Sequence, residues 1–316
     1  MSRQLIKLNI NTVKHLCLQL GISEAVLRYL SDHMADNVRR VYRTTTPGKT
    51  REIFKPGPGL LKVQRAINTN LLQRIKLPDP AHGSRKGRSH LTSAALHVGK
   101  EVVASLDIRN FFPSIHYKRV YNLFWDLGCA PDIARILTGL TTFNNSLPQG
   151  FATSPSIANL ILSTLDSRLE RLCAAHRLTY TRYVDDIIVS GNYRVEDLLR
   201  LFCQIVAETG FSVQLDKIRV MRKDTRQEVT GVLVNKKLNI PREEVRELRA
   251  ILHNCRVYGP STQTDASVEW FEQHLRGRIN YIVQLNPAIG NQLLGEYNRI
   301  DWPESAEQVI YSHSVQ

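Results

Sequence analysis

Two adjacent carboxylates, Asp185 and Asp186, lie in the stretch TRYVDDIIVSG, residues 181–191, between runs that alternate like the strands of a β-hairpin. Neighbouring carboxylates repel each other when both are ionised, so the pair predicts either a nearby cation or a solvated turn. Arg182 is the only basic residue in the stretch. Because Asp favours turns, an Asp-Asp pair in a hairpin is also common without any further role.

A third carboxylate, Asp107, lies near the end of the apolar run EVVASLDI, residues 101–108, which predicts a buried strand. If this strand and the hairpin are antiparallel neighbours, Asp107 comes close to Asp185 and Asp186. Three carboxylates in a basic protein suit Mg²⁺, which prefers oxygen ligands and completes its shell with water and substrate phosphates. Two such ions about 4 Å apart can activate a hydroxyl and stabilise a leaving pyrophosphate.

The composition favours a polyanionic partner. The 316 residues include 42 Lys and Arg against 29 Asp and Glu, a formal charge of +13. Nucleic acid is the first expectation and an acidic membrane the second. No run approaches the length of a membrane span, and the N-terminus lacks the apolar core of a signal peptide. We therefore expect a cytoplasmic protein with no membrane partner, and the five scattered cysteines predict reduced thiols.

The spacing of apolar residues predicts a mixed fold with a two- or three-part organisation. The region between about 101 and 234 predicts a split βαβ antiparallel sheet with helices on one face. The predicted elements are helices over residues 1 to about 40, a hairpin over 41–56 turning at Pro47-Gly48, a helix to about 76, a basic loop at 82–90, helices at 117–128, 153–173 and 195–210, strands at 211–215 and 228–235, and helices from 241 onward.

Basic residues recur at helical spacing in the segment that follows Pro241. They lie beside an apolar stripe and are almost free of acidic neighbours. A charged stripe is usually a solvated face, but this one favours a surface that follows phosphates. Its members are Arg242, Arg246, Arg249, His253 and Arg256.

Three segments in one order carry a family resemblance. ASLDIRNFFPSI, LPQGFATSPSIANL and TRYVDDIIVSG resemble motifs A, B and C of reverse transcriptases, with Asp185 lying 78 positions after Asp107. The resemblance spans roughly residues 40–235. The chain most resembles the compact bacterial retron enzymes. SAALH, residues 93–97, is similar to the retron pattern N-A-x-x-H with Ser93 in place of Asn, and V-T-G at 229–231 matches another retron pattern.

The resemblance implies an α+β right-hand polymerase with fingers, palm and a small helical thumb. Residues 1–45 would form a helical N-terminal extension and residues 46–100, with part of 128–147, the fingers. The palm with its split βαβ antiparallel sheet would cover residues 101–234. Residues 235–316 would form the thumb and bind RNA.

The resemblance also implies roles for single residues. Asp107, Asp185 and Asp186, with the Ile108 carbonyl, would hold two Mg²⁺ ions. The residues implied to bind the nucleotide are Arg51 and Lys55 at the triphosphate, Phe112 under the sugar, Gln149 and Gly150 in the pocket, and Lys217, the motif D lysine, near the departing pyrophosphate. Phe112 could instead be a core aromatic, and Arg51 and Lys55 ordinary strand charges.

The implied activity is RNA-directed DNA polymerisation with dNTPs on a cognate structured noncoding RNA. Priming from a guanosine 2′-OH would give a branched RNA–DNA hybrid (msDNA), and an effector protein in phage defence would be a further partner. Alternatives are another bacterial reverse transcriptase, of the group II intron, diversity-generating or abortive-infection type, and an idle RNA-binding protein of the same fold. The implied RNA contacts are His97, Val229, Thr230, Gly231, Arg242, Arg246, Arg249 and Arg256, although His97 could be a core histidine.

Overall fold

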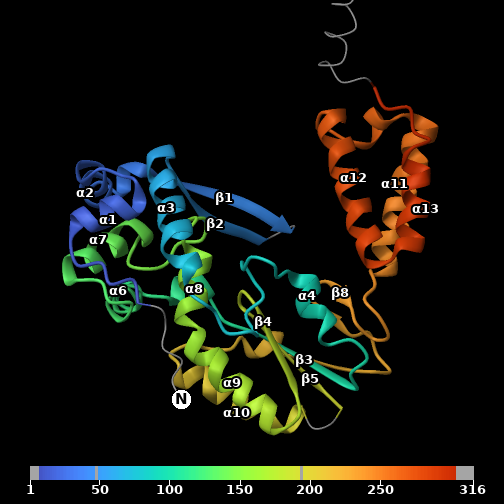
Figure 1. Cartoon of the computed structure of the whole chain (residues 1–316). Coiled ribbons are helices and arrows are strands. Elements are labelled where there is room, and N and C mark those ends of the chain that lie inside the picture. The colour runs from blue at the N-terminus through green and yellow to red at the C-terminus, as the bar shows by residue number, and fades with distance from the viewer. Residues whose placement is uncertain (1–6, 47–48, 193–194, 304–316) are drawn as a thin grey trace, which may run out of the picture. The chain divides into compact units, whose positions relative to one another are not determined.

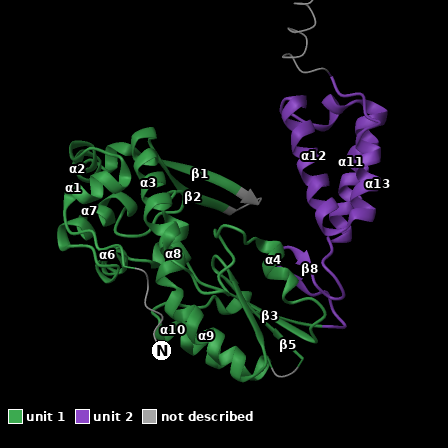
Figure 2. Cartoon of the chain, viewed as in Figure 1, with its two compact units in different colours: residues 1–222 green, residues 223–316 purple. Residues whose placement is uncertain are grey.

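The computed structural model describes residues 7–46, 49–192 and 195–303 and divides the chain into two units, drawn in green and purple in Figure 2. Unit 1 is Met1–Arg222 and unit 2 is Lys223–Gln316. The division falls shortly before residue 234, where the sequence predicts the palm to end. Among the described residues, no helix is long and apolar enough to cross a lipid bilayer.

Unit 1 begins with two short helices, α1 (Val13–Leu20) and α2 (Glu24–Asp32), whose buried leucines join the main core (Figure 1). The hairpin that follows pairs β1 (Val38–Thr46) with β2 (Lys49–Pro56) in antiparallel register. The predicted helical extension to residue 45 is therefore too long, because the chain is already extended and paired from residue 38. The predicted turn at Pro47-Gly48 lies outside the described residues.

The main sheet of unit 1 has the strand order β4-β5-β3-β6, and all its neighbours are antiparallel. The central strand β3 (Val102–Asp107) is almost wholly buried, as its apolar run predicts. The predicted hairpin is confirmed as β4 (Thr179–Tyr183) and β5 (Asp186–Gly191). The expected antiparallel pairing of the first strand with the hairpin is also confirmed, between β3 and β5.

The strand predicted at residues 211–215 is wrong. This segment makes only an isolated bridge, from Val213 to Ile108, and then enters the 3₁₀ turn Leu215–Lys217. The fourth strand is β6 (Arg219–Arg222), which pairs with β3 at the edge of the sheet. Most side chains of β6 are exposed, so it shows no apolar alternation from which it could have been predicted.

Helices cover both faces of the sheet at β4, whereas the sequence predicts helices on one face only. Successive side chains of a strand point to opposite faces. Tyr180 and Arg182 face α9 (Ser163–Ala175), where they bond to Asp166, and Thr181 faces Ser93 of α4 (His90–Ala95). The helices of unit 1 after the hairpin are α3 (Pro58–Asn70), α4 (His90–Ala95), α5 (Phe111–Ser114), α6 (Tyr117–Asp126), α7 (Pro131–Thr141), α8 (Ser154–Ile161), α9 (Ser163–Ala175) and α10 (Leu199–Glu208).

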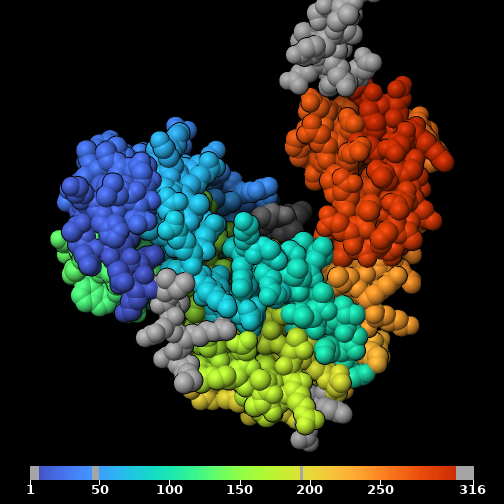
Figure 3. Space-filling view, viewed as in Figure 1, coloured from blue at the N-terminus to red at the C-terminus, as the bar shows by residue number. Residues whose placement is uncertain are grey.

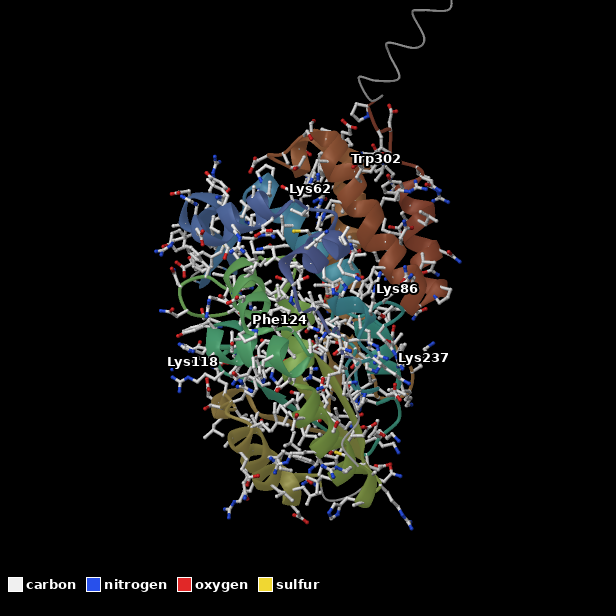
Figure 4. The ribbon with its side chains drawn as sticks, turned by 60° about the vertical axis from the view of Figure 1, so that its left-hand side comes forward. Lys62, Lys86, Lys118, Phe124, Lys237 and Trp302 are labelled. Carbon is white, nitrogen blue, oxygen red and sulfur yellow. The ribbon has the colours of Figure 1, made fainter. Side chains whose placement is uncertain are left out.

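The apolar side chains of these helices and of the sheet form one buried cluster. On α6, Phe124 points into the body of unit 1 and Lys118 points outward (Figure 4). The space-filling view shows that side chains close the gaps between neighbouring helices on this face of unit 1 (Figure 3). The single helix predicted over 153–173 is two helices, because the chain bends at Leu162 between α8 and α9.

Unit 2 starts with the short hairpin of β7 (Glu228–Val229) and β8 (Val232–Leu233) and continues into three helices. The helices are α11 (Arg242–Tyr258), α12 (Val268–Leu285) and α13 (Pro287–Tyr297). The apolar stripe predicted on the first of them is confirmed, since Val245, Leu248, Leu252 and Cys255 are all buried.

Gly290→Ala is expected to destabilise unit 2. A Cβ at Gly290 of α13 would lie 2.5 Å from the Cα of Val283 in α12, and such overpacking typically costs about 1–3 kcal/mol. Gly277→Ala is the matched control, because nothing lies within 4 Å of a Cβ there. Because alanine favours a helix interior more than glycine does, Gly277→Ala should raise the free energy of unfolding by about 0.5–1 kcal/mol. Denaturant unfolding measures both, and an unchanged midpoint for Gly290→Ala would contradict the close packing of α12 on α13.

Candidate active site

The three predicted carboxylates come together at one end of the sheet. In the register of β3 and β5, Asp107 is the direct partner of Asp186. The Ile108 N–H donates to the Asp185 carbonyl at 3.1 Å and so ties the end of β3 to the hairpin turn. The pairing predicted from the apolar runs therefore brings the acids of two distant segments side by side, as neighbouring strands require.

The turn that carries Asp185 has an unusual backbone. Tyr183 pairs with Asp186, so Val184 and Asp185 close the hairpin, and Val184 has φ of +60°. This left-handed conformation is unfavourable for a β-branched residue. Gly83 packs directly against the turn, because a Cβ at that position would lie 2.5 Å from the Val184 nitrogen.

Arg182 does not pair with the adjacent acids. Its side chain is fully buried and forms an ion pair with Asp166 of α9, through bonds of 2.7 Å from Nε and 2.8 Å from Nη2. Nη1 donates to the Val184 carbonyl at 2.8 Å and to Asn159 Oδ1 at 2.9 Å. The Tyr180 hydroxyl also donates to Asp166, at 2.7 Å.

Asp166 and Asn159 are not among the residues predicted from the sequence. The available signal is that Asp166 lies four residues after Leu162 and three before Leu169, on the buried face of its helix. A carboxylate on an apolar face needs a buried cation as partner. Arg182, in the middle of an otherwise apolar hairpin, is such a cation.

Burial, and after it the charges of Asp185 and Asp107, raise the pKa of Asp186 to about 6 against the opposing charges of Lys217 and Arg219. Burial likewise raises the pKa of Asp185. Among the charges that oppose this shift is Arg51 of β2. The site therefore carries excess negative charge that a bound cation would stabilise.

Lys217, which resembles the motif D lysine, contacts one of the three carboxylates. Its Nζ is 3.0 Å from Oδ2 of Asp107. The backbone fixes the approach, because the Gln214 N–H donates to the Asp107 carbonyl at 2.8 Å just before the 3₁₀ turn that carries Lys217. An ammonium group is thus already in contact with one of the predicted metal-binding carboxylates.

The remaining residues predicted to bind the nucleotide lie on β2, on the segment before α8 and on α5. The Phe54 N–H of β2 donates to the Gln149 carbonyl at 2.8 Å, and Gly150 has φ of +116°. A Cβ at Gly150 would lie 2.5 Å from the Phe54 carbonyl oxygen, so only glycine allows this approach. Arg51 and Lys55 are exposed on β2. Phe112 is half-buried against Phe111, with 5.1 Å between ring centroids. Their contacts with a nucleotide stay predictions.

His97 has no exposed surface, so it cannot contact RNA as the resemblance implies. The alternative interpretation, a core histidine, describes it correctly. Its Nδ1 lies 2.6 Å from the Ser190 hydroxyl and its Nε2 lies 2.8 Å from the Thr181 hydroxyl. Burial, and after it the charges of His82 and Lys100, lower the pKa of His97 to about 3, so the ring is neutral at physiological pH.

The other predicted RNA contacts lie in unit 2. Val229 is buried, whereas Thr230 and Gly231 form the turn of the β7–β8 hairpin with φ of +48° and +86°. The basic stripe is exposed along α11, and one of its members, Arg249, also bonds to Gln292 at 3.4 Å. Four arginines share this exposed face: Arg242, Arg246, Arg249 and Arg256.

The carboxylate oxygens of Asp107, Asp185 and Asp186 are suitable ligands for Mg²⁺. Three carboxylates at adjoining strand ends, two of them with a raised pKa, are the oxygen ligands that this ion prefers. Within the described ranges, no group of three His, Cys, Asp or Glu side chains has the spacing of an assembled metal site. In this arrangement the Lys217 ammonium contacts Asp107 instead.

Comparison with known proteins agrees with this geometry. The family described as "Reverse transcriptase (RNA-dependent DNA polymerase)" matches residues 45–240. The retron Mx65 reverse transcriptase of Myxococcus xanthus is 36% identical over 87% of this chain and 68% of its own length. The chain belongs to the retron reverse transcriptases. The retron Mx162 enzyme of the same organism is 32% identical over 94% of this chain and 68% of its own length.

The retron reverse transcriptase described here is thus an RNA-directed DNA polymerase. Its mixed fold with an antiparallel sheet is that of a right-hand polymerase, as the motifs predict. A solved foamy viral protease–reverse transcriptase in complex with double-stranded DNA is 17% identical, with a TM-score of 0.49, and the match covers 96% of this chain and 48% of that one.

Asp186→Asn is expected to stabilise the metal-free protein at pH 7 by about 1–3 kcal/mol. The folded carboxyl has a pKa of about 6, above its ordinary value of about 3.9, so ionisation favours the unfolded chain. The gain should be complete above pH 6 and should vanish as the pH falls towards 4. Denaturant unfolding with EDTA at several pH values measures it. Asp265→Asn, at an exposed position, is the control, and an equal gain there would contradict the assignment.

Proposed function

We propose that this reverse transcriptase copies part of a cognate structured noncoding RNA, starting from a guanosine 2′-OH in that RNA. The product would be a branched RNA–DNA hybrid, msDNA. The observation that carries the proposal is the meeting of Asp107, Asp185 and Asp186 at one end of the sheet in a chain with the retron patterns. An effector protein, a role in phage defence and a location in the bacterial cytoplasm complete the proposal.

The reaction would be attack of a nucleic-acid hydroxyl on the α-phosphate of a dNTP, with pyrophosphate as the leaving group. Asp107, Asp185, Asp186 and the Ile108 carbonyl would hold two Mg²⁺ ions, which supply activation of the hydroxyl and neutralisation of the leaving group when bound. Lys217 would give a proton to the pyrophosphate. Its Nζ already lies in the site, 3.0 Å from Asp107.

The nucleotide would be bound from the β1–β2 hairpin and from the segment before α8. Arg51 and Lys55 would contact the triphosphate, and the field of Arg51 at Asp185 supports the first assignment. Gln149 and Gly150 would line the pocket. Both contact the backbone of Phe54 in β2, so the hairpin and the segment before α8 are held together. Phe112 would exclude a 2′-OH and so favour deoxynucleotides.

The noncoding RNA would be recognised by unit 2. The arginines of α11 are exposed along one face, which suits contacts with successive phosphates. The turn at Thr230 and Gly231 would contact an RNA loop, and specific RNA recognition commonly uses such loops and 2′-OH groups. Residues 46–100, with part of 128–147, would then be the fingers, 101–234 the palm and 235–316 the thumb.

The first test is to express the protein with its flanking DNA and to extract total nucleic acid. We expect a short single-stranded DNA whose 5′ end is joined to RNA through a linkage that a debranching enzyme cleaves. Asp185→Asn with Asp186→Asn should abolish it, because both metal ligands are lost, while RNA binding survives. If the wild-type protein extends an added primer but makes no branched product, the retron-type priming is wrong and another bacterial reverse transcriptase type takes its place. Polymerisation by the double variant would contradict the metal assignment.

Arg246→Gln with Arg249→Gln is expected to weaken RNA binding and to flatten its salt dependence. Loss of two phosphate contacts should lower the slope of log K against log salt by about 1–2. Filter binding of the RNA that copurifies with the wild-type protein measures the slope. Arg135→Gln with Arg171→Gln removes the same charge from exposed helix positions of unit 1 and serves as the control. Equal slopes for the two pairs would make the stripe an ordinary solvated face.

A further inference from the structure

The buried guanidinium of Arg182 reaches from the core of unit 1 to the backbone of the catalytic turn. Two of its nitrogens bond to the carboxylate of Asp166, and Nη1 is shared between Asn159 and the Val184 carbonyl. The Arg182 and Asp166 side chains are both fully buried. The bond to Val184, at 2.8 Å, is therefore made by a group whose own position is fixed by α8 and α9.

The bond to Val184 acts on Asp185 through the geometry of the peptide unit. A peptide unit is planar, so the Val184 carbonyl and the Asp185 nitrogen turn together. Holding the Val184 oxygen therefore fixes the plane that enters Asp185. The plane that leaves Asp185 is fixed as well, because the Ile108 N–H donates to the Asp185 carbonyl at 3.1 Å. Both peptide planes around this carboxylate are thus held.

The turn requires such restraint because its backbone is unfavourable. Val184 is β-branched and has φ of +60°, a conformation that surrounding contacts must maintain. The same buried group of residues supplies a second contact, since Asn159 Nδ2 donates to the Gly83 carbonyl at 2.8 Å and Gly83 packs against the Val184 nitrogen. Asn159 therefore connects Arg182 and Gly83, which contact the turn at its carbonyl and at its nitrogen.

We propose that Arg182, held by Asp166 and Asn159, is a positioning residue for the polymerase reaction. It sets the direction of the Asp185 carboxylate through the Val184–Asp185 peptide plane, and it contacts neither nucleotide nor metal itself. The inference rests on the proposed role of Asp185 as a metal ligand. The ion pair with Asp166 alone would only stabilise the fold. The bond from Arg182 to the Val184 carbonyl is what extends its effect to the site.

Folding and positioning can be tested separately. Replacing both members of a buried ion pair by apolar side chains of similar volume is often neutral or stabilising, whereas removing one leaves a buried charge. Arg182→Met with Asp166→Leu should therefore fold with a melting temperature near that of the wild type. Arg182→Lys is the second variant, because it keeps a cation beside Asp166 but has no planar fork to reach Val184 as well.

Both variants are expected to lower kcat for dNTP incorporation by about 10- to 100-fold, with little change in KM for the dNTP. Both should also bind Mn²⁺ more weakly in the absence of substrate, which electron paramagnetic resonance of free Mn²⁺ measures directly. Ser93→Ala and Thr181→Val are the matched controls. They remove buried hydrogen bonds on the opposite face of β4 that do not reach the turn, so kcat and Mn²⁺ affinity should stay at wild-type values.

The outcomes separate this proposal from the proposed function. Wild-type kcat and Mn²⁺ affinity in folded Arg182→Lys or in the folded double variant would overturn the positioning role, provided that Asp185→Asn is inactive. An Asp185→Asn variant as active as the wild type would instead overturn the metal role on which both rest. A loss of kcat in the controls equal to that in the variants would show that any weakening of β4 suffices, and would also overturn the positioning role.

Discussion

A guanidinium group buried without water must find partners for its donors, and the partners of Arg182 organise the centre of unit 1. Asp166 fixes α9 against β4, Asn159 fixes α8, and the Val184 carbonyl fixes the hairpin turn. Removing one partner of a buried pair typically costs several kcal/mol, so these elements cannot shift independently. The opposite face of β4 is held in the same way, by the hydroxyl of Thr181 between Ser93 and His97. The strand β4, which leads into the β4–β5 turn, is therefore fixed on both faces by polar contacts.

The rigid scaffold brings together charges that disfavour folding. Asp107 and Asp186 are direct partners on neighbouring strands, and burial together with the neighbouring carboxylates raises the pKa of Asp186 to about 6. Lys217 reduces that cost by its contact with Asp107. A ligand that binds only the folded state adds its binding free energy to stability, so a metal ion held by these carboxylates would also stabilise the fold. The site is in this sense a strained element supported by the rest of unit 1.

Sequence periodicity predicted the elements whose signal is local. The buried β3, the β4–β5 hairpin and the apolar stripe of α11 follow from alternation or helical spacing, and the pairing of Asp107 with Asp186 follows from the first two. The motif resemblance supplied the order of the parts. Features that depend on distant partners could not be predicted in this way. The edge strand β6 has exposed side chains. The burial of His97 depends on the β4–β5 hairpin, whose Thr181 and Ser190 hydroxyls bond to its ring, whereas the resemblance to the retron pattern implied an RNA contact.

The joint between β2 and the segment before α8 limits how this enzyme can be recombined with its relatives. Gly150 leaves no space for a side chain against the Phe54 carbonyl, and the Phe54 N–H bonds to Gln149. The two surfaces fit each other at the level of the backbone, where no side-chain repacking can absorb a mismatch. A chimera that takes its hairpin from one parent and its segment 147–152 from another joins backbones shaped in different proteins. Crossover points in such chimeras should therefore keep both segments from the same parent.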